Sequence, residues 1–308
     1  MNHGRALLWA AVAPLILAST LAQAVTATAD SSTTPHHRRH HRHHHFRTLG
    51  DGPDLRSTSA LVLDETHSQV LYSRRADAPQ PIASISKLMT AMVVMDARQP
   101  LDEVLEITSN DCGVGRGTAS RLRVGTRLTR ADLLHLALMS SENRAAHALG
   151  RNYPGGMTAF VRAMNAKAQA LDMTTAHFVE PTGLSSDNVA SADDLSKMVA
   201  AAAKYPLIRE YSTDRHYTVR VGRRSVEFRT TDSLVANPAW EIIVQKTGYI
   251  TAAGRCLVMQ AVIDGRKVVI VLLNSFGKYT RVADARRVRK WMEAKLSVET
   301  ARTAGSTA

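Results

Sequence analysis

A serine and a lysine three residues apart, in Ser84-Ile85-Ser86-Lys87, are the first residues of this chain whose types could do chemistry. An apolar stretch of helical periodicity follows, which places Ser84 at a helix N-terminus and Lys87 one turn later on the same face. A serine is a weak nucleophile until a base takes its proton. A lysine is such a base only when neutral, and burial, a helix N-terminus or a second cation lowers its pKa. The pair predicts acyl transfer, although alone it also fits a capping serine and a solvated lysine.

Two further motifs carry groups that would complete such a site. Ser141-Glu142-Asn143 lies in a polar turn between two predicted helices, which can direct a hydroxyl and an amide into a cleft. Lys246-Thr247-Gly248 lies at the end of a predicted strand. Lys246 would be the second cation, and with Thr247 it could hold a substrate carboxylate. Gly248 would let a substrate backbone approach closely.

The predicted strands lie at both ends of the folded region, and the predicted helices lie between them. Apolar runs predict strands at 59–64, 69–74, 104–108, 217–221, 225–229, 242–246, 256–263 and 268–273. Helical periodicity is found at 84–96, 130–138, 142–150, 156–171, 192–204 and in the C-terminal segment. This order predicts an α+β fold. One antiparallel sheet would be built from both chain ends and flanked by helices, with a helical subdomain beside it.

In this order, the three motifs are the signature shared by class A β-lactamases and penicillin-binding proteins. The chain resembles a low-molecular-mass penicillin-binding protein of the serine D-alanyl-D-alanine peptidase family over about residues 57–295. The resemblance implies a β-lactamase/transpeptidase-like fold. The segments that resemble the D-alanyl-D-alanine endopeptidase branch in particular are Met139–Ala146, Phe178–Ser185, Lys246–Tyr249 with Ala252–Met259, and Phe276–Tyr279.

The resemblance also implies a role for each matching residue in hydrolysing D-alanyl cross-links in murein. Ser84 would form an acyl-enzyme with Lys87 as general base, and β-lactams would acylate Ser84 as pseudo-substrates. Ser141 would relay a proton to the leaving amine, with Lys246 nearby. The backbone N–H groups of Ser84 and Tyr249 would form the oxyanion hole. The substrate-binding residues would be Asn143, Thr247, Gly248 and Tyr249. No metal or organic cofactor is implied.

Three alternatives remain open at this point. A carboxypeptidase of the same family would release only terminal D-alanine, but that branch usually has a second β-rich domain and a membrane-binding tail, and this chain ends about 60 residues after Lys246. Glu180 could be the deacylating base of a β-lactamase, although Pro181-Thr182-Gly183-Leu184 fits the peptidase pattern better. A non-catalytic envelope-binding protein, using basic segments of the chain, is the alternative of a different class.

The first 24 residues have the features of a secretory signal peptide. Arg5 gives a positive start, residues 6–21 are apolar, and Ala22-Gln23-Ala24 matches an A-x-A cleavage site. The apolar stretch is too short and too rich in alanine for a comfortable membrane span. We therefore expect cleavage near Ala24 and a periplasmic protein.

Residues 25–48 have a low-complexity composition that includes seven of the 13 histidines, interspersed with arginine. Nothing in this segment can form a core, which predicts a disordered linker. It would be a solvated spacer, a contact for an anionic envelope polymer, a metal-binding tract or a purification tag. A serine D,D-peptidase domain is expected at 49–298 and a disordered tail at 299–308.

Lysine and arginine outnumber acidic residues by 39 to 27, which gives a net charge of +12. The signal and linker account for 4 of these charges. The densest remaining cluster is Arg281, Arg286, Arg287, Arg289 and Lys290. Its apolar neighbours recur at helical spacing, which predicts a last helix with a basic outer face, or else a helix on a membrane surface. Export and an aromatic content of 5% argue against nucleic acid as a partner, and we expect at most peripheral membrane association.

The two cysteines, Cys112 and Cys256, are 144 residues apart, and sequence cannot place them within bonding distance. We expect both to be unpaired. The histidines outside the linker are scattered without ligand spacing, so no metal site is expected among them.

Overall fold

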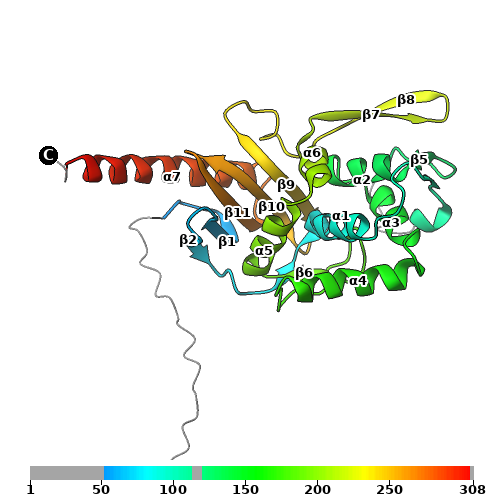
Figure 1. The fold of residues 1–308 in the computed structure, drawn as a ribbon, viewed down its shortest axis with the longest axis horizontal. Coiled ribbons are helices and arrows are strands. Elements are labelled where there is room, and N and C mark those ends of the chain that lie inside the picture. Colours follow the sequence, from blue (N-terminus) through cyan, green and yellow to red (C-terminus); the bar gives the residue numbers. More distant parts are fainter. Residues whose placement is uncertain (1–51, 113–119, 306–308) are drawn as a thin grey trace, which may run out of the picture. The chain divides into compact units, whose positions relative to one another are not determined.

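The computed structural model describes residues 52–112 and 120–305, with side chains described as far as Leu296. The predicted signal peptide and linker lie outside the described residues. The described segments belong to one compact unit, whose elements are shown in Figure 1.

Strands from both ends of the unit form one five-stranded antiparallel sheet, in the order β2-β1-β11-β10-β9. The bounds are β1 (Ser57–Asp64), β2 (Gln69–Arg74), β9 (Glu241–Ile250), β10 (Gly254–Ile263) and β11 (Arg266–Ser275). β1 pairs with β11, so that Ala60 lies opposite Leu272 and Val62 opposite Ile270. The predicted sheet built from both chain ends is therefore confirmed, and all the described helices except the C-terminal one lie between its two halves in the sequence.

Both faces of this sheet are buried. On one face Leu257 and Met259 of β10 pack with Ala285 and Val288 of α7 (Thr280–Gly305), whereas Val258 belongs to the cluster on the other face. Neighbouring residues of a strand point to opposite faces, so a strand covered on both sides is a continuous apolar run. This is why β10 and β11 are recognisable from sequence. Figure 1 shows α7 along one face and α5 (Ala192–Ala202) on the other.

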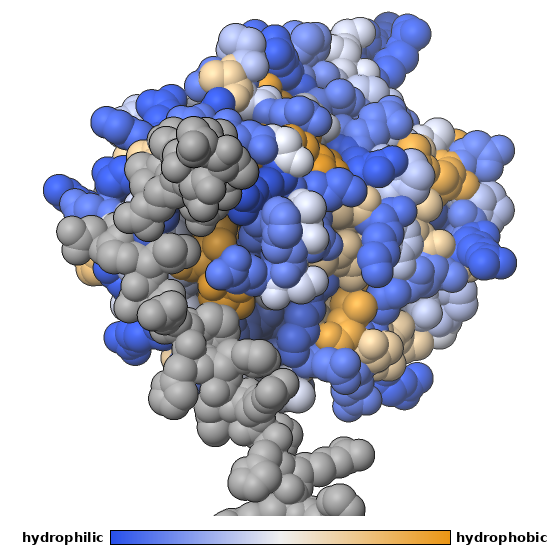
Figure 2. Space-filling view, turned by 60° about the vertical axis from the view of Figure 1, so that its left-hand side comes forward, coloured by the Kyte–Doolittle hydropathy of each residue, from blue (hydrophilic) through white to orange (hydrophobic). Residues whose placement is uncertain are grey.

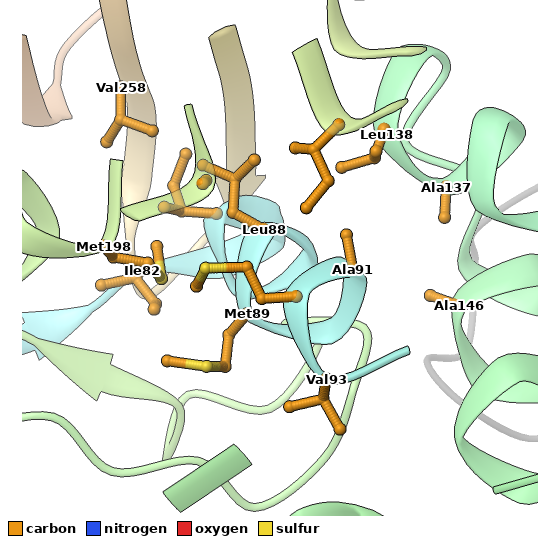
Figure 3. Packing of buried hydrophobic residues seen from close by; sticks show 14 of the residues in the cluster. Ile82, Leu88, Met89, Ala91, Val93, Ala137, Leu138, Ala146, Met198 and Val258 are labelled. Atoms are coloured by element: carbon orange, nitrogen blue, oxygen red, sulfur yellow. The ribbon is translucent and has the colours of Figure 1, made fainter. Parts of the chain in front are cut away.

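A central helix, α1 (Ser86–Asp96), runs through the helical part of the unit. Side chains of the surrounding elements point toward it from several sides, including Ala137, Ala146, Met198 and Val258 in Figure 3. Ser86 to Val94 are all buried, so α1 is covered all round. The neighbouring helices are α2 (Arg130–Met139), α3 (Asn143–Arg151), α4 (Gly156–Ala170) and α6 (Pro206–Thr213).

Several short elements lie around this frame. The smaller strands are β3 (Gln80–Pro81), β4 (Val104–Glu106), β5 (Arg127–Thr129), β6 (Val189–Ala190), β7 (His216–Val221) and β8 (Arg224–Arg229). β7 and β8 form the predicted hairpin as a separate two-stranded sheet. The sequence did not predict α6, an eight-residue helix that begins at Pro206. Two single-turn helices, η1 (Ala83–Ile85) and η2 (Ser109–Asp111), complete the described elements.

The C-terminal helix differs from the sequence prediction at its far end. We expected a disordered tail from residue 299, but α7 continues to Gly305. At its near end, the buried Asp284 accepts hydrogen bonds from the N–H groups of Arg56 and Ser57 at 3.1 and 2.7 Å. This carboxylate ties the first turns of α7 to β1 and fixes the position of Arg281, one turn earlier.

The surface contains few extended apolar areas in the view of Figure 2, where hydrophilic residues predominate over the coloured part of that face. Within the described residues, no helix is long and apolar enough to cross a membrane.

Candidate active site

Lys87 is the centre of the hydrogen-bonded groups around Ser84. Its Nζ lies 2.9 Å from Ser84 Oγ, 2.7 Å from Asn143 Oδ1 and 2.5 Å from the carbonyl oxygen of Thr182. The first turn of α1, the start of α3 and a loop after α4 thus meet at one amine. The lysine side chain is fully buried. The structure therefore brings together Ser84, Lys87 and Asn143, which the sequence predicted as site residues.

Ser84 lies in η1, one short turn before α1, rather than in the α-helix that the sequence predicted from residue 84. The preceding Ala83 has a φ of +50°, which an L-residue rarely adopts. The chain therefore turns sharply before Ser84, and the serine side chain stays half-buried while its neighbours Ala83 and Ile85 are fully buried. Such strain is typical of functional turns.

A second pair joins Lys246 of β9 to Ser141, in the turn between α2 and α3. The Nζ of Lys246 lies 2.9 Å from Ser141 Oγ and 2.8 Å from the carbonyl oxygen of Thr247. Ser141 has a φ of +61°. The turn therefore holds the hydroxyl of Ser141 against a lysine from the opposite side of the site.

Burial determines the charge state of both lysines. It lowers the pKa of Lys87 to about 7, while the carboxylates of Glu180 and Glu142 act in the opposite direction. Burial also lowers the pKa of Lys246 well below its ordinary value, and the charges of Lys87 and Arg281 add to the effect. A buried ammonium is costly unless it is well paired, and a second nearby cation raises that cost. Lys87 therefore lowers the pKa of Lys246, whereas the sequence predicted that Lys246 would act on Lys87, whose pKa is lowered by burial alone.

The remaining predicted site residues lie on β9. The hydroxyl of Thr247 is 2.6 Å from that of Thr231. A Cβ added to Gly248 would lie 3.2 Å from the backbone nitrogen of Ser84 and 3.0 Å from the carbonyl oxygen of Ile82. Glycine therefore lets β9 pass directly beside the turn that carries Ser84. Tyr249 follows on the strand, and 54% of its surface is exposed.

The loop at 180–185 supports Lys87 from the other side. The Glu180 carboxylate accepts hydrogen bonds from the N–H groups of Thr182 and Gly183 at 2.6 Å each, and a third from Ser185 at 3.3 Å. The side-chain amide of Asn188 donates a fourth, at 3.1 Å. Glu180 therefore organises its own loop and presents the Thr182 carbonyl to Lys87.

Sequence reasoning missed Arg281. It was assigned to the basic outer face of the last helix, but it is partly buried and its Nη1 donates to the carbonyl oxygen of Gly248 at 2.9 Å. Burial lowers its pKa. The buried Asp232 faces the same region, and its pKa is raised by burial despite the nearby charges of Arg281 and Lys246. Its position in the sequence could have distinguished Arg281 from the surface residues of this helix. It is the only basic residue in the first turn of α7, and the other basic residues of the cluster come later.

Other sequence predictions concern residues outside this site. Cys112 and Cys256 are both free, which confirms that they are unpaired. Among the described residues, no three His, Cys, Asp or Glu side chains are grouped so that they could hold a metal ion. His135 is stacked between Tyr211 and Tyr217 with ring centroids 4.3 and 3.9 Å away, which is a packing role.

Comparison with known proteins identifies the family. The model of the D-alanyl-D-alanine carboxypeptidase family, peptidase S11, matches residues 47–277. The chain belongs to this family. Among the relatives of this S11 member, a D-alanyl-D-alanine endopeptidase of Pseudomonas aeruginosa is 52% identical over 242 residues, 78% of each chain. A D-alanyl-D-alanine endopeptidase of Escherichia coli is 49% identical over 248 residues, 80% of each.

Solved structures agree with the fold of this S11 member. The Streptomyces K15 DD-transpeptidase superposes with a TM-score of 0.74 at 26% identity, covering 79% of this chain and 99% of that one. A D-alanyl-D-alanine carboxypeptidase from Mycobacterium tuberculosis gives a TM-score of 0.72 at 26% identity, over 79% of this chain and 93% of that one. The predicted transpeptidase-like α+β fold is confirmed.

Proposed function

We propose that this S11 member is a serine D-alanyl-D-alanine endopeptidase that hydrolyses D-alanyl cross-links in murein through an acyl-enzyme on Ser84. The observation that carries the proposal is the buried amine of Lys87, 2.9 Å from Ser84 Oγ, with its pKa lowered to about 7. Family membership and the two endopeptidase relatives at 52% and 49% identity support the same reaction.

Acylation begins with neutral Lys87. Its two N–H bonds can donate to Asn143 Oδ1 and the Thr182 carbonyl, which leaves the lone pair directed at the Ser84 hydroxyl. The proton of Ser84 passes to this lone pair while Oγ attacks the D-alanyl carbonyl carbon. The negative charge that develops on the carbonyl oxygen is bound by the backbone N–H groups of Ser84 and Tyr249.

The intermediate then collapses and the C–N bond breaks. The leaving amine takes a proton through Ser141, whose hydroxyl is held 2.9 Å from Lys246 Nζ. The Ser141 hydroxyl in turn takes up the proton that Lys87 removed from Ser84, which returns Lys87 to its neutral form, with Lys246 nearby. Water then adds to the carbonyl carbon of the ester, and the C–O bond to Ser84 breaks. A proton from the water is transferred to the Ser84 oxygen, which restores the hydroxyl. β-Lactams enter the same first step and leave a stable acyl-enzyme.

Substrate is held along β9 and at the start of α3. Asn143 offers its amide to the substrate backbone while its Oδ1 accepts from Lys87. Thr247 and the adjacent Thr231 form a hydroxyl pair beside Lys246 that can donate to a carboxylate. Gly248 permits close approach of the substrate backbone, and Tyr249 borders the exposed end of the strand.

Endopeptidase activity is favoured over carboxypeptidase activity by the degree of similarity. The two endopeptidase relatives are about half identical to this chain, whereas a Streptomyces carboxypeptidase is 26% identical over 257 residues. The signal-like residues 1–24 support export to the periplasm, where murein is found, with cleavage near Ala24. Sequencing the N-terminus of the mature protein tests that cleavage.

Purified cross-linked muropeptide dimers test the activity directly. We expect dimers to be converted to monomers, and release of terminal D-alanine alone would assign the protein to the carboxypeptidases. Labelling with a fluorescent penicillin should disappear in Ser84→Ala and persist in Ser233→Ala, an exposed serine on the loop before β9. A wild-type protein that is never labelled would instead be the non-catalytic binding protein.

A further inference from the structure

An unusual group of exposed aromatic residues lies at the end of β9 and after β11. Five large hydrophobic residues are exposed in the described part of the chain, and three of them belong to this group. The exposed fractions are 54% for Tyr249, 80% for Phe276 and 70% for Tyr279. Folding alone does not require such exposure, and clustered exposed aromatics commonly mark a binding surface.

Two cations accompany these rings. The Arg255 guanidinium lies 4.4 Å from the ring centroid of Tyr249, and Lys278 Nζ lies 5.4 Å from that of Tyr279. Neither cation forms an ion pair with a described residue. We call these five residues, Tyr249, Arg255, Phe276, Lys278 and Tyr279, the aromatic shelf. It combines apolar area with positive charge that is free for an external carboxylate.

The backbone shapes a pocket of about 330 Å³ in the shelf, lined by residues of β9, the turn after it, β10, β11 and the segment after β11. Two of its lining residues, Gly254 and Asn274, have φ values of +62° and +50°. A Cβ on Gly254 would lie 2.4 Å from Asn274 Oδ1. The pairing of β10 with β11 also shifts register between Arg255 and Leu257, and such bulges bend the strand and redirect its side chains. The hollow is therefore built by the fold.

The shelf is continuous with the catalytic groups. Tyr249 directly follows Gly248, and a Cβ on Gly248 would lie 3.2 Å from the nitrogen of Ser84. The carbonyl oxygen of Gly248 also accepts a hydrogen bond from Arg281. Arg281 lies in the first turn of α7, which begins directly after Tyr279. A substrate that reaches Ser84 along β9 and continues past Tyr249 therefore lies over the shelf.

We propose that the aromatic shelf is a subsite for a murein stem peptide beyond the scissile D-alanyl bond, a proposal that rests on the proposed function. Stem peptides combine aliphatic side chains with free carboxylates, which match the exposed rings and the two free cations. Sugar rings stack on open aromatic faces, but two of the three rings here already have a cation over one face. The chemistry therefore favours the peptide over the glycan strand.

The test replaces the three shelf residues outside the strands, in the triple variant Phe276→Ser/Lys278→Ser/Tyr279→Ser. We expect kcat/KM on muropeptide dimers to fall about tenfold through KM, because several rim contacts are lost together. The rate of acylation by a small penicillin without a fluorophore, followed by mass spectrometry, should stay within about twofold, since that reagent ends near Ser84. Lys267→Ser, at the opposite end of β11, and Val104→Ser, on β4, are exposed controls that should change neither rate.

Direct binding separates this proposal from the proposed function. The Ser84→Ala protein is titrated with the same dimers, and the shelf substitutions should weaken its binding about tenfold. Equal binding and cleavage by the triple variant would overturn the subsite. Binding without cleavage by the wild type would refute the proposed function and leave the subsite standing. A loss that vanishes when the sugars are removed from the dimers would assign the shelf to the glycan and overturn the peptide assignment.

Discussion

The two buried lysines show why the site needs more than a serine near a base. Lys87 and Lys246 are both fully buried, and the charge of Lys87 adds to the effect of burial in lowering the pKa of Lys246. In water a lysine is protonated at neutral pH and cannot accept a proton from serine. Burial therefore converts Lys87 from an ordinary cation into a group that is half neutral near pH 7.

This charge state predicts the pH dependence of acylation. Below a pKa of about 7, Lys87 is protonated and cannot take the Ser84 proton, so the rate should fall about tenfold for each unit below pH 7. Above that value the rate should reach a plateau. Stopped-flow labelling with a fluorescent penicillin between pH 5 and pH 9 measures the profile. A rate that is flat across pH 5 to 7 would contradict Lys87 as the base.

A substitution that keeps the charge but removes the base makes a second prediction. Arginine stays protonated in proteins, so Lys87→Arg should reduce penicillin acylation by about 100-fold or more at every pH. Circular dichroism establishes whether the variant is folded, and Lys267→Arg serves as the matched exposed control. Recovery of the variant's activity at pH 9 would be incompatible with the assigned role.

At the scale of elements, the turn that carries Ser84 depends on close contacts between backbones. Gly183 has a φ of +79°, and a Cβ there would lie 1.9 Å from the carbonyl oxygen of Ala83 and 2.7 Å from the nitrogen of Ser84. The loop organised by Glu180 is therefore pressed directly against the turn that carries Ser84. Only glycine allows both the backbone conformation and the contact.

Gly183→Ala should consequently displace the Ser84 turn and destabilise the protein. Gly125→Ala is the matched control, because Gly125 has a φ of +83° but no atom within 4 Å of an added Cβ. Both variants have the strain of a positive φ, which costs about 1 kcal/mol of stability. Only in Gly183→Ala does the added Cβ also clash with the backbone of Ala83 and Ser84. We expect Gly183→Ala to lose at least 2 kcal/mol more in urea unfolding and to label slowly with penicillin. Equal losses in the two variants would show that the contact has no importance.

The elements divide clearly into those that sequence predicts and those it does not. β10, β11 and α1 are long and are covered on all sides. Their burial requires long apolar segments, and such segments can be recognised in the sequence. α6 has only eight residues and begins at a proline, so its pattern is too short to separate from a loop. The η1 turn at Ala83 was also missed, because its φ of +50° is imposed by the packing of Gly183 and Gly248 rather than by local preference.

The site shows the same division. The types and spacing of the Ser84, Ser141 and Lys246 motifs predict their chemistry, because one helical turn or one strand end determines each local geometry. Arg281 and Thr231 depend on contacts between distant segments, with Gly248 and Thr247 respectively. Their positions are set by the sheet and by α7, so no local pattern distinguishes them from surface residues.

At the scale of the whole molecule, catalysis and stability make opposite demands on Lys87. The unfolded chain exposes this lysine at its ordinary pKa of 10.5, whereas burial lowers the pKa to about 7 in the folded protein. Between these values the unfolded state binds more protons than the folded state, so the contribution of Lys87 to stability rises with pH. Below pH 7 the penalty is complete and constant. The folded protein therefore holds Lys87, the proposed general base, neutral at a cost to its stability.

Lys87→Met should remove this pH dependence. Its stability relative to the wild type is expected to fall by about 3 kcal/mol between pH 7 and pH 9.5, because one pKa unit corresponds to about 1.36 kcal/mol. Removing the charge of Lys87 also relieves Lys246, which acts in the same direction. Urea unfolding at the two pH values measures the difference, with Lys267→Met as the control for loss of an exposed lysine. A difference between Lys87→Met and wild type that is the same at pH 7 and pH 9.5 would mean that Lys87 is charged in the folded protein, and the general-base mechanism would fail with it.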